Sequence, residues 1–155
     1  PLEAVCEEDN PVIVIFHDHC HSAKGTVYHG GAYNPSVVWR NNGLPAGAGS
    51  EALGSNIDFA PTMLDLAGAG LPDDVDGRSF LPQLRGKNGN PRAWIHVQNH
   101  DNRHVRSRDW ILTNEEELRP TVELGRERAQ AVRDPLTAAQ AAAKATLEEA
   151  LRESG

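Results

Sequence analysis

The sequence predicts an α/β fold, in which part of a mostly parallel sheet sandwiched by helices is followed by a small antiparallel sheet and a terminal helix. The unbroken apolar run VIVIF at residues 12–16 is typical of a strand that is covered on both faces. Short, half-polar segments after residue 91 indicate an antiparallel sheet with one face in water. The Ala-rich residues 136–153 favour a helix.

The elements before residue 92 belong to the α/β part. Residues 1–10 are expected to end a helix, and residues 36–39 to form a second short strand. The turn-rich residues 41–56 indicate a surface loop. A short helix is expected over residues 59–67, with Asp58 as its N-terminal cap. We therefore assign residues 1–91 to the α/β domain.

Residues 92–155 are assigned to a small antiparallel subdomain with a C-terminal helix. Its expected strands lie within the segments RAWIHVQ, RHVRS and DWILT. Thr137 and Gln140 form a capping-box pattern at the start of the helix. The apolar positions Leu136, Leu147 and Leu151 make only a narrow stripe, so the helix is expected to dock weakly at one edge.

Composition restricts the classes of partner. The 155 residues carry a net charge of −7, and 39% of them are hydrophobic. Such a chain is a poor general binder of nucleic acid, because phosphate recognition needs clustered Lys and Arg. No stretch approaches the roughly 18 apolar residues of a membrane-spanning helix, so no membrane partner is expected. The start at Pro1 shows no signal-peptide pattern, resembles a chain entered in its middle, and leaves the localisation unknown.

Metal-type ligands follow the first strand directly. Ligands gather at the carboxyl ends of strands in open α/β sheets, and His17, Asp18, His19, Cys20 and His21 stand at such an end. A carboxylate there suits a hard divalent ion, and an imidazole in the same turn can join it. A turn-forming Asp is the alternative. Nothing in the sequence supplies a partner base that would make Cys20 a nucleophile.

Five segments in order resemble the C-terminal portion of the sulfatase family, within the alkaline phosphatase-like superfamily. The resemblance spans residues 12–113. The segments are FHDH (residues 16–19), KGTVYHGGAYNPSVVW (24–39), DFAPTMLDLAG (58–68), DGRSFLPQLRG (76–86) and HVRSRDWILT (104–113). The fold implied is the C-terminal part of the sulfatase α/β domain, and the implied activity is hydrolysis of a sulfate ester of a small molecule or glycan.

The resemblance assigns roles to three residues. Asp18 and His19 match the second pair of ligands to the family's divalent cation, usually Ca²⁺. Lys24 matches the lysine that contacts the sulfate oxygens, where a cation offsets charge on the sulfuryl group and the leaving oxygen. An ordinary exposed lysine is the alternative for Lys24. Arg106 could touch substrate, although a half-exposed strand arginine is more often structural.

The chain also departs from the family pattern. The family's nucleophile is made from Cys or Ser in Cys/Ser-x-Pro-x-Arg, and neither Cys6 nor Cys20 lies in such a motif. The N-terminal strand that supplies another pair of aspartate ligands is absent too. One carboxylate and one imidazole bind a hard ion weakly, because Ca²⁺ takes about six to eight oxygen ligands. We therefore expect the chain to be inactive alone and to need the N-terminal portion of the same enzyme.

Other hypotheses remain open. His17, Asp18, His19, Cys20, His21 and His29 could form a non-catalytic module for a transition metal such as Zn²⁺, which suits nitrogen and sulfur donors. A degenerate remnant without a site is another, and a phosphate or phosphonate ester hydrolase is the nearest enzymatic alternative. A sheet that is cut partway leaves an open edge and an uncovered apolar face, so the lone chain is expected to be aggregation-prone.

Overall fold

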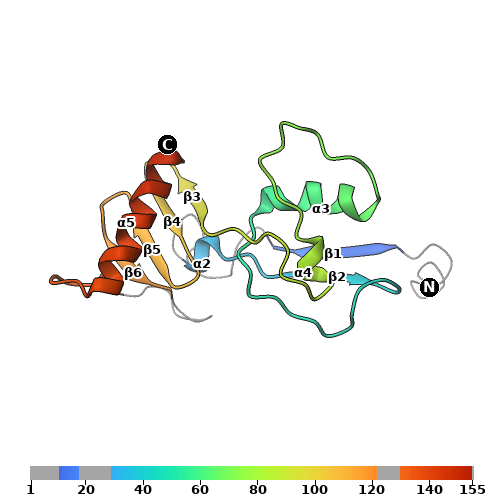
Figure 1. The fold of residues 1–155 in the computed structure, drawn as a ribbon, viewed down its shortest axis with the longest axis horizontal. Coiled ribbons are helices and arrows are strands. Elements are labelled where there is room, and N and C mark those ends of the chain that lie inside the picture. Colours follow the sequence, from blue (N-terminus) through green and yellow to red (C-terminus); the bar gives the residue numbers. More distant parts are fainter. Residues whose placement is uncertain (1–10, 18–28, 122–129, 155) are drawn as a thin grey trace. The chain divides into compact units, whose positions relative to one another are not determined.

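The computed structural model of the protein describes residues 11–17, 29–121 and 130–154, and Figure 1 shows its elements. The chain divides into two units. The first unit comprises residues 1–16 and 36–92, and the second comprises residues 17–35 and 93–155. The α/β class, the small antiparallel sheet and the terminal helix are confirmed. The domain assignment to residues 1–91 and 92–155 stays a prediction.

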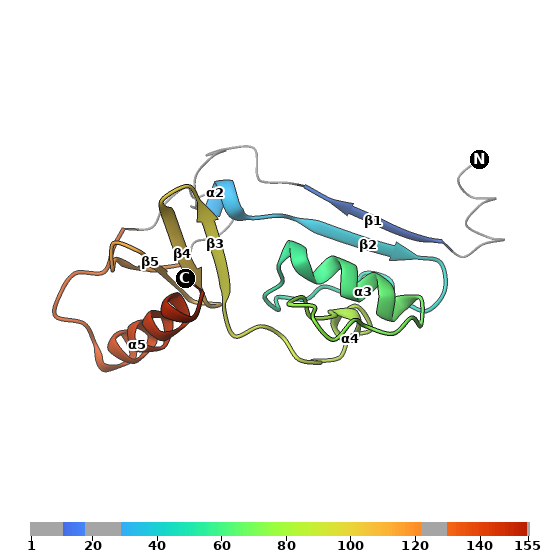
Figure 2. The same cartoon turned by 90° about the horizontal axis from the view of Figure 1, so that it is seen from above.

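A two-stranded antiparallel sheet lies in the first unit. Strand β1 (Val12–Phe16) pairs with β2 (Ser36–Arg40), so both strands expected here are confirmed. The described strands contain no parallel pair. The expectation that β1 is covered on both faces is wrong for the described residues, because Ile15 is 59% exposed. Only the side of the ribbon that faces α3 is covered by a described helix (Figure 2).

Two short helices and a 3₁₀ turn complete the first unit. The turn η1 (Asn56–Asp58) leads into α3 (Phe59–Leu66), and α4 (Leu81–Leu84) follows a loop. Helix α3 ends where the sequence predicts, because Gly68 takes a left-handed φ of 71° that terminates the helix. Phe59 stacks on Phe16 of β1 at a centroid distance of 4.9 Å, which ties α3 to the sheet.

The second unit contains a four-stranded antiparallel meander in the order β3-β4-β5-β6. Strands β3 (Ile95–Asn99), β4 (Asn102–Arg106) and β5 (Trp110–Thr113) confirm the three predicted segments. Strand β6 (Leu118–Pro120) was not predicted, because three residues that include Arg119 and Pro120 show no apolar alternation. One turn of helix, α2 (His29–Ala32), also belongs to this unit.

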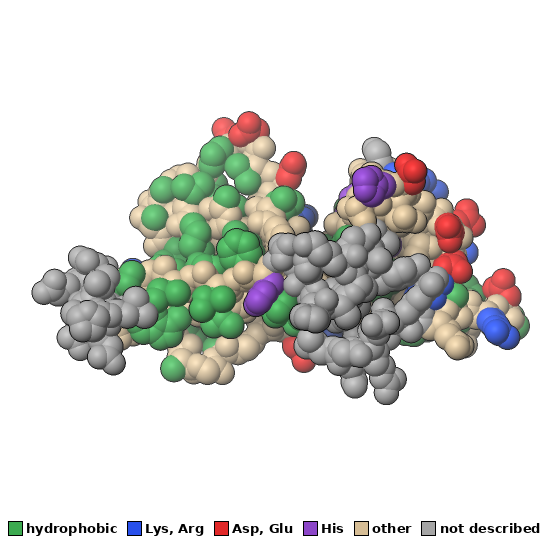
Figure 3. Space-filling view, turned by 180° about the vertical axis from the view of Figure 1, so that it is seen from behind, with side chains coloured by type: hydrophobic (Ala, Val, Ile, Leu, Met, Phe, Trp, Pro, Cys, Tyr) green, Lys and Arg blue, Asp and Glu red, His purple; other side chains and the backbone are tan. Residues whose placement is uncertain are grey.

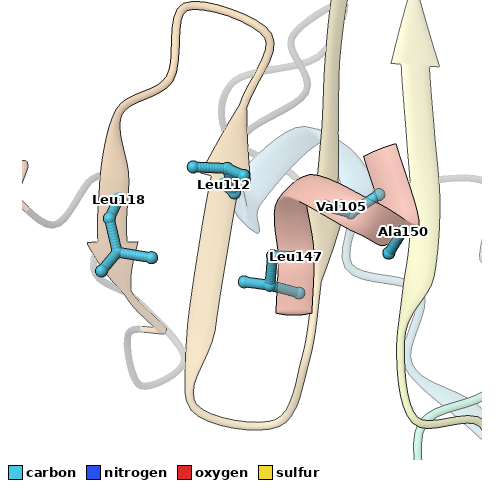
Figure 4. Packing of buried hydrophobic residues seen from close by; sticks show 5 residues of the cluster. All are labelled: Val105, Leu112, Leu118, Leu147 and Ala150. Atoms are coloured by element: carbon cyan, nitrogen blue, oxygen red, sulfur yellow. The ribbon is translucent and has the colours of Figure 1, made fainter. Parts of the chain in front are cut away.

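Helix α5 (Ala138–Glu153) packs on a face of this sheet. Its predicted capping box is confirmed, since Thr137 N–H donates to Gln140 Oε1 at 2.9 Å and Gln140 N–H donates to Thr137 Oγ1 at 3.3 Å. The expectation of weak docking at one edge is wrong. The helix contributes two side chains that are 2% exposed, and Figure 4 shows them against three strands; the cluster is Val105, Leu112, Leu118, Leu147 and Ala150. Ala150 widens the apolar stripe that the leucines alone leave narrow.

Within the described ranges, every helix is too short or too polar to cross a bilayer.

Candidate functional site

The segment that carries the predicted site is anchored at both ends. Phe16 at the end of β1 lies opposite Ser36 at the start of β2, so the chain leaves the sheet and returns to it at the same position. The backbone N–H of His17, the residue after β1, donates a hydrogen bond to Asn34 Oδ1 at 2.9 Å, which is a second connection between the two ends of the segment. These two connections hold the ends of the intervening segment side by side.

The predicted ligands lie inside that segment and outside the described residues. This holds for Asp18, His19 and Lys24, and also for Cys20 and His21 of the zinc hypothesis. Cys6 lies outside the described residues too. His17 is described and exposed, while His29 is described only as the first residue of α2. The assigned roles of Asp18, His19 and Lys24 therefore stay predictions.

The described residues do not supply a metal centre of their own. Among residues 11–17, 29–121 and 130–154, no three His, Cys, Asp or Glu side chains gather closely enough to hold a metal ion. A Ca²⁺ ion takes about six to eight oxygen ligands, and Asp18 with His19 offers too few. A complete calcium site would therefore need carboxylates from outside the described part of the chain.

The sheet of the second unit has one largely apolar face and one face of mixed polarity. Residues alternate between faces along a strand, and cross-strand partners share a face. Val105 and its partner Leu112 point toward α5. The other face, which we call the mixed face, carries His104 with its partner Thr113 and Arg106 with its apolar partner Ile111. In Figures 1 and 2, α5 and α2 lie on opposite sides of this sheet, so the mixed face is the one on the side of α2.

Two basic side chains on this mixed face are desolvated. His104 is 2% exposed, and burial, with smaller contributions from Arg106 and His96, lowers the pKa of His104 to about 4. Burial also lowers the pKa of Arg106, while the electrostatic interaction with Tyr33, which follows α2, acts in the opposite direction. His104 and Thr113 are thus buried together with apolar Ile111 on the side of the sheet that faces α2. His104 is neutral at pH 7 and serves there as a packing residue.

We expect this histidine to make the fold sensitive to mild acid. Below a pH of about 6.5 the unfolded chain binds a proton at His104, whereas the folded chain does not. The free energy of unfolding therefore decreases as the pH is lowered from about 6.5 to about 4. His104→Gln should flatten that slope, as measured by urea unfolding at pH 7, 6 and 5. The exposed turn residue His100, changed to Asn, is the matched control and should keep the original slope. An unchanged slope in His104→Gln would contradict the assignment.

Asp58 has a structural role. The residue is 2% exposed, and its carboxylate accepts hydrogen bonds from Arg92 (Nη2 to Oδ1 2.6 Å, Nε to Oδ2 2.9 Å) and from the backbone N–H groups of Ser55 and Arg78, both at 2.8 Å. The expected cap of α3 is corrected in part: Asp58 occupies the N-cap position, but its side chain makes no cap bond to that helix. Its oxygens are occupied by these four donor groups instead.

The pKa of Asp58 reflects two opposed effects. Burial raises this pKa. The hydrogen bonds from Arg92, Arg78 and Ser55, together with the Arg92 charge, lower it by more than burial raises it, so the net pKa lies below the ordinary value.

Gly77, next to this centre, has to be a glycine, because a Cβ at that position would overlap the carbonyl oxygen of Ile57 and come within 2.8 Å of Pro61 Cγ. Packing therefore explains why the Asp-Gly turn has a glycine at this position.

Sequence reasoning missed Arg92 and His104. Arg92 stands at the start of RAWIHVQ, and nothing near it in the sequence indicates a carboxylate partner 34 residues away. His104 alternates with apolar Val105 in a pattern that leaves the buried face ambiguous.

A family model described as N-sulphoglucosamine sulphohydrolase, C-terminal, matches residues 18–116. The matched range begins at Asp18 and includes Lys24, β2, the Asp58–Arg92 pair and the strands β3 to β5. The chain therefore belongs to the sulfatase family and corresponds to a C-terminal portion of its members.

Individual relatives agree with this placement. The chain is 34% identical over 100 residues to N-acetylglucosamine-6-O-sulfatase of Bacteroides thetaiotaomicron, a match that covers 60% of the chain and 18% of that protein. Human arylsulfatase A is 39% identical over 70 residues, which covers 44% of the chain and 14% of that protein. Phosphonate monoester hydrolase from Silicibacter pomeroyi superposes with a TM-score of 0.74 at 25% identity, over 99% of the chain and 36% of that structure. The chain thus spans well under half of the relatives it matches.

Proposed function

We propose that the chain supplies the C-terminal share of the active site of a sulfuric ester hydrolase. In this proposal Asp18 and His19 bind a divalent cation, Ca²⁺, and Lys24 binds the sulfate group of an esterified small molecule or glycan. The nucleophile comes from a portion of the enzyme outside the chain. The observation that carries the proposal is the family match, which begins at Asp18 and contains the anchored segment with Lys24.

The chemistry is compatible with these roles. A bound cation would polarise a sulfuryl oxygen, and the Lys24 ammonium would offset the charge on the sulfuryl group and the leaving oxygen. Two donors from one turn would hold the ion only with the help of further carboxylates. The chain alone is therefore proposed to be inactive. The name N-acetylglucosamine-6-O-sulfatase of one relative favours a sulfated sugar as the substrate class.

The completed enzyme, meaning this chain joined to the portion encoded upstream of Pro1, provides the test. We expect an in-frame Cys/Ser-x-Pro-x-Arg motif in that portion, sulfate ester hydrolysis by the completed enzyme, and none by the 155-residue chain. Chelation of calcium should abolish the activity, and Asp18→Asn should raise the calcium concentration needed to restore it. The exposed Asp73, changed to Asn, is the matched control and should leave that concentration unchanged.

Two results would contradict the proposal as a whole, and a third would contradict its cation alone. One is sulfate ester hydrolysis by the 155-residue chain. The other is zinc that the isolated chain retains through dialysis and loses on changing Cys20 and His21, which would support the metal-binding module. Calcium-independent activity would contradict the assigned cation.

A phosphonate ester is the second candidate substrate class. The superposition on a phosphonate monoester hydrolase at a TM-score of 0.74 favours it. The ratio of kcat/KM for an aryl sulfate and an aryl phosphonate monoester, measured on the completed enzyme, decides between the two classes.

A further inference from the structure

Arg106 is a half-buried cation on the mixed face of the second sheet. Its strand β4 lies between β3 and β5, and its cross-strand partners there are the apolar Ile95 and Ile111. Figure 3 shows acidic and basic side chains of this unit at the molecular surface, whereas the side chain of Arg106 is partly withdrawn from water. Desolvation of a guanidinium costs free energy unless other groups stabilise it, so this position calls for a partner beyond the two isoleucines.

The segment of residues 17–35 provides a partner in Tyr33. The mixed face lies on the side of α2, and Tyr33 directly follows α2 (Figures 1 and 2). Burial lowers the pKa of Arg106, and the electrostatic interaction with Tyr33 acts in the opposite direction. A guanidinium can donate to a phenol oxygen or stack on an aromatic ring, so a neutral tyrosine is sufficient. Both residues belong to the second unit.

Tyr33 stands next to the hydrogen bond that closes the segment. Asn34 is the following residue, and its Oδ1 accepts from the backbone N–H of His17 at 2.9 Å. Tyr33 and Asn34 are both half-buried. A side chain that fixes Tyr33 on the sheet therefore also restrains the acceptor one residue later, and through it the start of the segment.

We propose that Arg106 is a positioning residue for the candidate site and that it acts through Tyr33. It holds the return end of residues 17–35 on the second sheet, and the hydrogen bond between Asn34 and His17 passes that restraint to the start of the segment. The inference rests on the proposed function, because the same segment contains the three predicted site residues. Contact between Arg106 and the substrate, one of the two roles that the sequence leaves open, is not required.

Hydrogen exchange of the 155-residue chain, followed by mass spectrometry, tests the positioning without an assay of activity. In Arg106→Met, which removes the charge, we expect peptides that contain His17 and residues 29–35 to lose protection, while those from β5 and β6 keep theirs. Tyr33→Leu leaves the sheet itself unchanged and should cause the same local loss. Arg103→Met is the matched control, because Arg103 is a half-buried arginine of the same strand that lies on the opposite face.

Kinetics of the completed enzyme give the second readout. Arg106→Met should lower kcat/KM for an aryl sulfate by about 10- to 100-fold, the usual effect of losing a residue that orients a site. Arg106→Lys keeps a positive charge and should recover part of that loss. The double variant with Tyr33→Leu should lose no more than either single variant, because the two side chains act as one unit. Arg103→Met should leave kcat/KM unchanged.

Every result of these measurements supports or overturns the positioning role. A local loss of protection, together with a non-additive double variant, supports it. A loss spread evenly over residues 95–120 shows that Arg106 only stabilises the sheet and overturns it, and so does unchanged exchange in both single variants. Additive losses of kcat/KM show that Arg106 and Tyr33 act separately and overturn it too. A completed enzyme without sulfate ester hydrolysis refutes the proposed function, whereas the exchange result still decides whether Arg106 fixes the segment.

Discussion

Replacing Lys24 with alanine in the completed enzyme is expected to lower kcat/KM for an aryl sulfate by about 10²- to 10³-fold, the usual effect of removing one donor from a developing oxyanion. In the proposed role Lys24 faces a negative charge that grows as the ester bond breaks, so the contact would strengthen toward the transition state. Most of the loss should therefore appear in kcat, with a smaller rise in KM. Steady-state kinetics of the purified variant measure both terms.

Two further variants make this result specific. Lys24→Arg keeps the positive charge and should recover part of the activity, although guanidinium geometry differs from that of an ammonium group. Lys87→Ala is the matched control, because Lys87 is an exposed lysine in a loop of the first unit. If Lys24→Ala behaves like Lys87→Ala, the sulfate-binding role of Lys24 is wrong.

Changing Asp58 to alanine is expected to destabilise the first unit by about 3–5 kcal/mol, the cost of leaving one partner of a buried ion pair alone. The Asp58 side chain is 3% exposed and that of Arg92 is 15% exposed, with 2.6 Å between Oδ1 and Nη2. Loss of the carboxylate also leaves the backbone N–H groups of Ser55 and Arg78 without their acceptor. Hydrogen exchange over residues 53–92, followed by mass spectrometry, reports the stability of this unit separately from the second one.

A partly exposed ion pair, with side chains 27% and 42% exposed, provides the comparison. Lys144 Nζ lies 3.7 Å from Glu148 Oε1 on α5, and Glu148→Gln should change the free energy of unfolding by no more than about 0.5 kcal/mol. Lowering the pH should destabilise the first unit, as the Asp58→Ala substitution does. Because its pKa is lowered in the folded state, its contribution is present above the ordinary pKa of 3.8 and is lost as the pH falls through the lowered value. Similar costs for Asp58→Ala and Glu148→Gln would show that the buried pair adds little.

The predictable parts of the fold are those with a local signal. Residues 12–16 and the three segments of the second sheet have strand patterns within a few residues, and Thr137 with Gln140 forms a cap over four residues. The docking of α5 was predicted wrongly because alanines were not counted as core residues, although Ala150 is 2% exposed. The apolar run of β1 predicts cover on both faces, but Ile15 is 59% exposed, because the sequence of a strand does not say which other element, if any, packs on it.

The candidate site also has a part that sequence motifs predict and a part that only the fold reveals. The order of five motifs predicts roles for Asp18, His19 and Lys24, and the family match from residue 18 onward supports that order of motifs. The Asp58–Arg92 pair joins two positions far apart in sequence, so only the fold reveals it. Asp58 had a ready local explanation as a helix cap, and that explanation hid its long-range partner.

The separation of Asp58 and Arg92 also determines when the first unit can complete its folding during translation. The ribosome adds residues from the N-terminus, so Asp58 is made 34 residues before the guanidinium that neutralises it. Until then its carboxylate stays hydrated, and Arg92 is the last residue of the unit. The nascent chain therefore closes this polar centre only once the whole unit has been synthesised.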